Sequence, residues 1–364
     1  MIGLAYVILG FTFIQMLVAL VNLLARQKLN HSEGTFNGLV SVLIPARNEE
    51  HNIEMLLGDL QNQHYKNIEI IVFDDESTDR TAEIVQRSSA LDDRIKLLHS
   101  GGLPEGWLGK NHACHSLAEI ARGDYLLFLD ADVRIKNDSI PNAVSFSQKH
   151  ALGLLSVFPK QIMLTPGEWC IVPVMNYILL SLLPLILVMR SKNPSLVAAN
   201  GQFMLFERKT YKATLPHAKM RSHRVEDIEI ARYYKQQKIR IACIAGGAAI
   251  TCRMYSGFRE AMNGFSKNVI IFFGNSFLLA ILFWLITTFG IVPIVFALPV
   301  GIVIIYLLTF LVTRILISFI SKQSILKNLI YLLPQQCFLG LIIYKAIIYQ
   351  FKKQHHWKGR NISV

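Results

Sequence analysis

Apolar residues run together near both ends of the chain, and polar residues gather between about 26 and 268. Residues 2–24 are almost entirely apolar and are followed by Arg26 and Lys28. Because a helix needs about 20 apolar residues to cross a bilayer, we predict an N-terminal transmembrane anchor at 1–25. The run lacks a basic start and a small-residue cleavage site, which favours an uncleaved anchor over a signal peptide.

Further apolar runs follow the polar region. Those near 269–289 and 292–313 predict two transmembrane helices within 269–320. The run 325–349 is broken by Pro-Gln-Gln and has basic residues at both ends, so we predict a re-entrant or interfacial helix, followed by a basic cytoplasmic tail at 350–364. The positions of Lys and Arg predict a multi-pass protein of the cell (inner) membrane with its polar region in the cytoplasm.

Short β-branched runs alternate with polar helical patterns through residues 38–268. Such alternation indicates an α/β domain with a mostly parallel sheet, helices on both faces, and ligands beyond the carboxyl ends of the strands. The predicted strands are 40–44, 68–73, 95–98, 125–129 and 200–206, and the predicted helices are 50–62, 79–89, 111–122 and 223–234.

The stretch 170–189 is apolar enough to span a membrane. A crossing there would place the acids at 226 and 227 in the opposite compartment from the acids near 130. We therefore predict an interfacial apolar helix that lies on the membrane or covers an acceptor groove.

The formal net charge is +12, but the Lys and Arg residues cluster beside the apolar runs and form no stripe interleaved with aromatics. This pattern is typical of membrane proteins and speaks against nucleic-acid binding. The five cysteines show no paired spacing, which predicts a reducing compartment without a disulfide framework. No pattern predicts the oligomeric state.

Polar residues follow the first two predicted strands. The segment Pro45-Ala46-Arg47-Asn48-Glu49-Glu50 can contact a nucleobase, or Asn48 can cap a helix whose first turn carries the two Glu residues. Asp74 and Asp75 end the second strand, and their carboxylates suit the hydroxyls and N–H of a nucleoside. A capped turn there explains one acid but not the whole acidic run.

Asp130 and Asp132 follow the fourth predicted strand. Alternate residues of an extended segment point the same way, so both carboxylates can converge on one hard cation. A divalent ion at this position neutralises a nucleoside diphosphate as it leaves. The sequence therefore predicts a metal site at Asp132 and Asp130.

A glycine-rich loop, residues 101–111, enters the helix that precedes this strand. Its Lys110 offers a point charge for a diphosphate, although the spacing is not that of a Walker loop. His112 and His115 lie at i and i+3, but without a third ligand we interpret them as helix-surface residues.

Glu226 and Asp227 lie near the start of the last predicted helix of the polar region. One of these carboxylates can remove the proton of an acceptor hydroxyl. Acids at this position are also favoured by the helix dipole alone. Spacing does not separate the two interpretations.

In this order, over residues 40–268, these elements resemble the family 2 glycosyltransferases, which have the GT-A fold with a Rossmann-like mixed sheet. The chain is most similar to membrane-bound carotenoid, chlorobactene, diaponeurosporenoate and hopanoid-associated glycosyltransferases. The segments that carry the resemblance are Pro45–Glu50, Gly106–Lys110, Asp130–Val133, Arg253–Tyr255, Gly264–Asn268 and Trp357–Arg360.

The resemblance implies inverting transfer of one sugar, with UDP-glucose as the expected donor, to a lipid-like acceptor such as a carotenoid or other isoprenoid. It implies Asp227, preceded by Glu226, as the general base and Mg²⁺ or Mn²⁺ bound by Asp132 and Asp130. Asp75 would bind the nucleoside, and Asp130 the ribose or the metal. The implied substrate-binding residues are Pro45, Arg47, Asn48, Glu49, Asp74, Asp75, Lys110, Asp130, Arg253 and Lys267.

The chain departs from the family pattern twice. Glu76 stands where Gly is usual, and the Gln-x-x-Arg-Trp motif of processive synthases is absent, which predicts a single transfer. One alternative is a polyprenyl-phosphate glycosyltransferase, whose phosphate acceptor needs no strong base. Another is a non-catalytic membrane scaffold with a transferase-like domain. A transporter is disfavoured because no charged residue lies in mid-span before Arg314.

Overall fold

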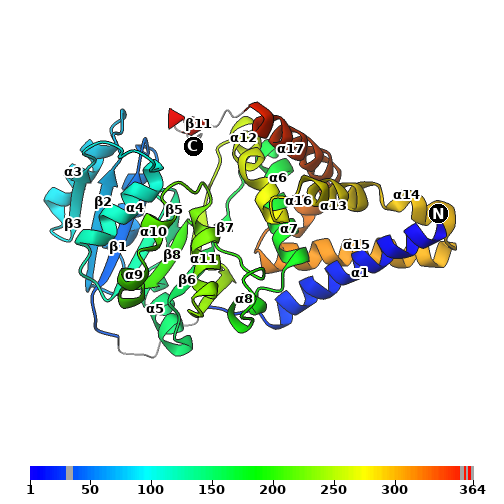
Figure 1. Ribbon diagram of the computed structural model, residues 1–364, viewed down its shortest axis with the longest axis horizontal. Coiled ribbons are helices and arrows are strands. Elements are labelled where there is room, and N and C mark those ends of the chain that lie inside the picture. The colour runs from blue at the N-terminus through cyan, green and yellow to red at the C-terminus, as the bar shows by residue number, and fades with distance from the viewer. Residues whose placement is uncertain (30–35, 353–355, 358–359, 362–364) are drawn as a thin grey trace.

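The computed structural model describes residues 1–29, 36–352, 356–357 and 360–361 (Figure 1). The molecule has an α/β part built on a seven-stranded sheet and a bundle of apolar helices from both ends of the chain. The bundle lies to one side of the sheet (Figure 1).

Four parallel strands form one half of the sheet in the order β3-β2-β1-β4 and confirm the first four predicted strands. Along β1, Val42 and Ile44 pack on one face and Leu43 on the other, so apolar contacts cover both faces as predicted. The strands are β1 (Val40–Ala46), β2 (Ile68–Asp74), β3 (Ile95–His99) and β4 (Tyr125–Leu129), and the helices between them are α2 (Ile53–Gln61), α3 (Thr81–Leu91) and α4 (Gly109–Ile120).

The other half of the sheet makes it mixed. β8 (Phe203–Glu207) lies between β4 and β6 (Leu154–Phe158), antiparallel to both, and β9 (Ile241–Ala245) adds parallel to β6. Because β8 runs opposite to β4, Phe203 pairs with Leu129. The segment before β8 therefore lies at the same edge as the carboxyl end of β4.

Smaller elements surround this frame. β5 (Val133–Ile135), β10 (Ile250–Cys252) and β7 (Lys160–Gln161) form a three-stranded sheet. The remaining elements of this part are α5 (Ser139–His150), α9 (Arg208–Thr214), α10 (Pro216–Lys219) and α11 (Glu226–Gln236), and the hairpin β11 (His356–Trp357) and β12 (Arg360–Asn361) lies near the C-terminus.

The apolar stretch 170–189 is divided among three short helices, where the sequence predicted one. They are α6 (Pro166–Ile171), α7 (Pro173–Leu182) and α8 (Ile186–Arg190). Pro173 begins α7 and Pro184 separates it from α8, because proline lacks the N–H that a continuing helix needs. With 10 residues, α7 is about 15 Å long, half the thickness of a bilayer core.

Three helices are long and apolar enough to cross a membrane, and a bent pair could form a fourth span. The three are α1 (Ile2–Leu24), α15 (Val300–Ile320) and residues Leu332–Gln350 of α17 (Leu332–Lys352). In the bent pair, α12 (Phe258–Asn268) and the 3₁₀ helix η1 (Val269–Phe273) meet α13 (Phe277–Phe289) at 101°.

The observed helices differ from the predicted boundaries at two places. The predicted span 292–313 is interrupted, because α14 (Ile291–Ala297) ends before Pro299 and α15 starts after it. The predicted helix 325–349 is α16 (Ile325–Ile330) followed by α17. The predicted tail, 350–364, lies partly outside the described residues.

Hydrogen bonds join α1 to the end of α7 and to the segment between α7 and α8. The Asn22 amide donates to the carbonyls of Leu180 at 3.0 Å and Leu183 at 2.9 Å, and its oxygen accepts from the Leu185 N–H at 2.7 Å. Asn22 thus satisfies backbone groups that the proline break leaves without helical partners.

Candidate active site

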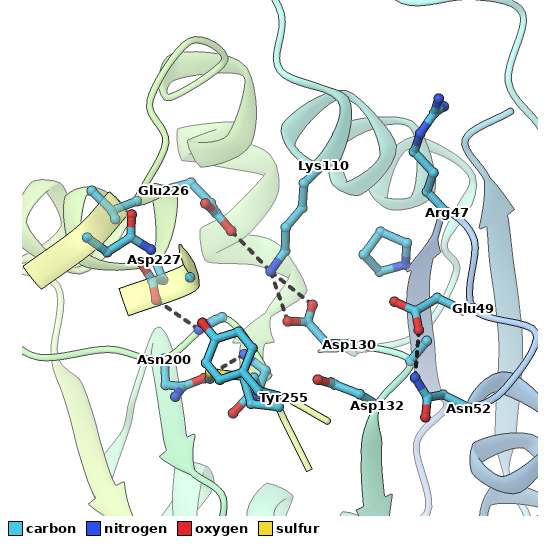
Figure 2. A pocket seen from close by; sticks show the side chains of 18 of the residues that line it. Arg47, Glu49, Asn52, Lys110, Asp130, Asp132, Asn200, Glu226, Asp227 and Tyr255 are labelled. Atoms are coloured by element: carbon cyan, nitrogen blue, oxygen red, sulfur yellow. Dashed lines mark hydrogen bonds and ion pairs between the residues drawn. The ribbon is translucent and has the colours of Figure 1, made fainter. Parts of the chain in front are cut away.

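A cavity of about 990 Å³ lies where β1, β2 and β4 end, bordered by the segment before β8 and the start of α11 (Figure 2). Its position agrees with the expectation for this sheet type. Of the predicted site residues, the cavity is lined by Pro45, Arg47, Asn48, Glu49, Asp75, Lys110, Asp130, Asp132, Glu226, Asp227, Arg253 and Lys267.

Hydrogen bonds join the loop after β1 to the loop after β2. The Asn48 side-chain oxygen accepts from the Thr78 N–H at 2.8 Å, and Arg47 donates to the backbone carbonyl of Asp75. α2 begins only at Ile53. The interpretation of Asn48 as a helix cap is therefore wrong, since its side chain serves the neighbouring loop.

Asp74 and Asp75 are adjacent but occupy different environments. The Asp74 carboxylate accepts from the Ser77 N–H at 3.3 Å and lies 3.7 Å from Nδ1 of His99. Asp74 does not line the cavity, whereas Asp75 does. Asp74 thus orders the turn, and Asp75 is the acid of this pair that can contact a ligand.

Lys110 forms the centre of a charged cluster (Figure 2). Its Nζ lies 2.9 Å from Oδ1 of Asp130 and 3.4 Å from Oε1 of Glu226. Burial opposes the charge, but the two carboxylates outweigh it and hold the pKa of Lys110 well above its ordinary value. Lys110 therefore stays protonated in the cavity. It lies in the first turn of α4, and its two partners lie after β4 and at the start of α11.

Asp132 has an unusual carboxyl group. Its Oδ1 is buried and has no hydrogen-bond partner. Burial, and then the charge of Asp130, raise the pKa of Asp132 to about 7. Among the residues that the structure describes, no group of three or more His, Cys, Asp and Glu could hold a metal ion. A cation at the Asp130–Asp132 pair would therefore need further ligands from a bound substrate.

Asp227 lies in the first turn of α11. Its Oδ2 accepts from the Gly201 N–H at 2.9 Å and its Oδ1 from the Ile228 N–H at 2.8 Å. Burial, and then the charge of Glu226, raise the pKa of Asp227 to about 7. A carboxyl group with such a pKa can both accept and release a proton near neutral pH.

Gly201 allows this arrangement and was missed from the sequence. A Cβ at this position would lie 2.9 Å from Nζ of Lys110 and 3.4 Å from Oε1 of Glu226. The close approach brings the backbone N–H of Gly201 to Asp227. Only the strand pairing that places residues 200–202 beside β4 reveals this requirement.

Glu168 is a second residue that sequence reasoning missed. It is 0% exposed, forms a capping box with Thr165, and accepts a 2.9 Å hydrogen bond from Nη2 of Arg253 at the cavity wall. The Thr165-x-x-Glu168 pattern signals a helix start. It gives no hint of a partner 85 residues away.

The glycine-rich loop contributes to the cavity through Leu108–Asn111. The ring of Trp107 stacks on His115 at 5.2 Å and meets the edge of His112 at 5.7 Å. The sequence predicted helix-surface residues, but both histidines are half-buried and pack against Trp107.

Residues 41–215 match the model of the family "Glycosyl transferase family 2". Several relatives carry the name 4,4'-diaponeurosporenoate glycosyltransferase, including proteins from two Staphylococcus species. The one from Staphylococcus haemolyticus (strain JCSC1435) is 29% identical over 66% of this chain and 63% of its own length. The one from Staphylococcus aureus (strain USA300) is 25% identical over 89% of this chain and 88% of its own.

Among solved structures, the chain resembles a mannosyltransferase from Pyrobaculum calidifontis in complex with GDP-Man and Mn²⁺. The TM-score is 0.55 at 15% identity, over 97% of this chain and 100% of that one. This likeness shows a shared fold.

Proposed function

We propose that the protein transfers one sugar from a nucleotide-sugar to a lipid-like acceptor. The match of residues 41–215 to glycosyltransferase family 2 and the fold shared with a mannosyltransferase support this proposal. The observation that carries the proposal is the meeting of Lys110, Asp130, Asp132 and Asp227 in one cavity at the strand ends. The proposed donor is UDP-glucose, with Asp75 and the loop after β1 around the nucleoside.

A divalent cation, Mg²⁺ or Mn²⁺, fits the Asp130–Asp132 pair. The buried, unpartnered Oδ1 of Asp132 is a hard oxygen ligand of the kind that these cations prefer. When bound, the cation would neutralise the departing diphosphate. Lys110 supplies a second positive charge for the same group and holds Asp130 in place.

The proposed reaction is a single displacement with inversion. The acceptor oxygen attacks the anomeric carbon opposite the diphosphate, whose bond to that carbon breaks. Asp227 takes the proton of an acceptor hydroxyl, and its raised pKa suits this work at neutral pH. The absence of the processive motif supports one transfer per acceptor.

The proposed acceptor is a carotenoid or other isoprenoid, reached from the cytoplasmic side of a membrane that the chain crosses several times. Two observations support it: the name shared by the two staphylococcal relatives, and the contribution of α12 and η1, part of the bent candidate span, to the cavity wall. The basic flank of α1 supports the cytoplasmic side.

The test uses detergent-solubilised full-length protein with UDP- and GDP-sugars, Mg²⁺ or Mn²⁺, and either total membrane lipid or purified 4,4'-diaponeurosporenoate. We expect nucleoside diphosphate release together with one new glycolipid, identified by mass spectrometry. Asp132→Ala should abolish both. Failure of the wild-type protein to modify any lipid with any donor would refute the proposal.

A further inference from the structure

Apolar side chains outside the charged cluster also line the cavity. We call six of them the apolar arm: Phe158, Ile162, Met175, Phe265, Ile271 and Phe272. At about 990 Å³, the whole cavity reaches the upper end of the range for single-ligand sites, roughly 300–1,000 Å³. The volume leaves room for an apolar group beside the donor.

Four of the six arm residues come from helices, whereas Phe158 ends β6 and Ile162 follows β7. Met175 comes from α7, Phe265 from α12, and Ile271 and Phe272 from η1. Met175 is 6% exposed and Phe265 is 7% exposed, so their side chains are fixed by packing. Lys267 and Asn268 also line the cavity just before η1. The cavity residues thus change from polar at the end of α12 to apolar in η1.

η1 occupies a corner between the cavity and the apolar bundle. The α12–η1 segment meets α13 at 101°, and η1 packs against both α13 and α17. Phe273 of η1 contacts Phe283 of α13 with ring centroids 5.2 Å apart. Beyond the corner, α13 exposes Leu278, Leu279 and Leu282. The apolar surface therefore leads from the arm onto helices suited to a bilayer.

We propose that the apolar arm binds the hydrocarbon segment next to the reacting group of the acceptor. This inference rests on the proposed function and adds where the acceptor lies. A chain that leaves a bilayer for the arm exchanges one apolar surrounding for another, so the arm gains little from the hydrophobic effect. Its role is to orient the chain and to select its shape, with aromatic rings and Met175 as packing surfaces.

The test narrows the arm at Ile271, a partly exposed position. Ile271→Trp is compared with Leu308→Trp, which adds the same ring to an exposed site on α15 outside the cavity. Transfer from UDP-glucose is measured to 4,4'-diaponeurosporenoate and to dimethylacrylate, a short acid without a long chain. Donor binding is followed by titration with UDP.

For Ile271→Trp we expect kcat/KM for the long acceptor to fall at least tenfold. Affinity for UDP and transfer to dimethylacrylate should stay within about twofold, and Leu308→Trp should resemble the wild type. Unchanged transfer to the long acceptor, or an equal loss with both acceptors, would overturn the proposal. If the wild type modifies neither acid nor any membrane lipid, the proposed function fails first, and this inference fails with it.

Phe272→Ala provides a second route if Ile271→Trp does not melt cooperatively. It widens the arm at another partly exposed position. The arm should then accept acceptors that are bulkier in the hydrocarbon segment next to the reacting group. We expect the ratio of kcat/KM for a branched acid to that for the linear chain to rise at least threefold. An unchanged ratio would contradict a selecting role for the arm.

Discussion

At the scale of single residues, Asp227 shows how position sets chemistry. Two backbone N–H groups orient its carboxylate, while burial and Glu226 raise its pKa to about 7. Because the proposed base works only when deprotonated, kcat/KM with a hydroxyl acceptor should fall about tenfold for each pH unit below about 7. A pH–rate profile with a membrane alcohol as acceptor measures this slope.

Asp227→Asn keeps the shape of the side chain and removes its basicity. With an isoprenoid alcohol as acceptor we expect kcat to fall by about 10²–10⁴. The corresponding isoprenoid acid is already ionised at neutral pH, so it brings its own nucleophilic oxygen and should lose far less. An equal loss with both acceptors would show that Asp227 does not act as the base.

Gly201 gives a second residue-scale prediction. In Gly201→Ala the new methyl group would press on Nζ of Lys110, the mobile end of a long side chain, so the fold should survive. The displaced Lys110 would hold Asp130 less well, and we expect KM for the donor to rise about tenfold. Gly247→Ala serves as the control because nothing lies within 4 Å of the corresponding Cβ. Equal kinetics in both variants would argue against this role of position 201.

At the scale of elements, the sequence predicts the strands that local apolar runs mark. It does not predict which strands pair with each other in the sheet. The strands before Asp75 and Asp130 are predicted correctly, because each is a short apolar run that is followed directly by acidic residues. The insertion of β8 between β4 and β6 is set by tertiary contacts, so its effect on Gly201 is invisible. The different environments of Asp74 and Asp75 depend likewise on the turn that Asp74 orders.

The start of α6 supplies an element-scale prediction. Glu168→Gln replaces the charge that holds Arg253, so we expect KM for the donor to rise several-fold. Thr165→Val removes the cap at a cost of about 1 kcal/mol but leaves the Glu168–Arg253 pair intact, so KM should not change. In an Arg253→Gln background, Glu168→Gln should have no further effect on KM. A further rise there would show that Glu168 acts by another route.

At the scale of the whole molecule, the apolar bundle and the α/β part share one hydrophobic core, and Asn22 of α1 adds polar contacts to it. Asn22→Leu would leave two carbonyls and one N–H near Leu185 without partners, each costing about 1–3 kcal/mol. We expect the melting temperature in detergent to fall by several degrees. Thr313→Val, which removes a hydrogen bond within α15, is the control and should change the melting temperature less. Equal falls in melting temperature would mean that the Asn22 hydrogen bonds stabilise the protein no more than a hydrogen bond within one helix.

The helices of the membrane region were only partly predictable from the sequence, because prolines break the apolar runs. Hydropathy finds apolar runs but not the breaks at Pro173, Pro184 and Pro299, each of which shortens a helix. No Asp or Glu follows Glu260 in the sequence, so every charged side chain beyond it is basic. That bias supports an orientation in the membrane but does not say which runs cross it.

The corner at η1 has a kinetic consequence. If the acceptor passes from the bilayer around this corner into the cavity, it never becomes a solute in water. The enzyme then responds to the mole fraction of acceptor within its own membrane, not to the amount per volume of solution. Diluting the bilayer with inert phospholipid at constant total acceptor should slow the reaction. Diluting the vesicles with buffer that holds the donor and the cation at the same concentrations should leave the turnover of each enzyme molecule unchanged.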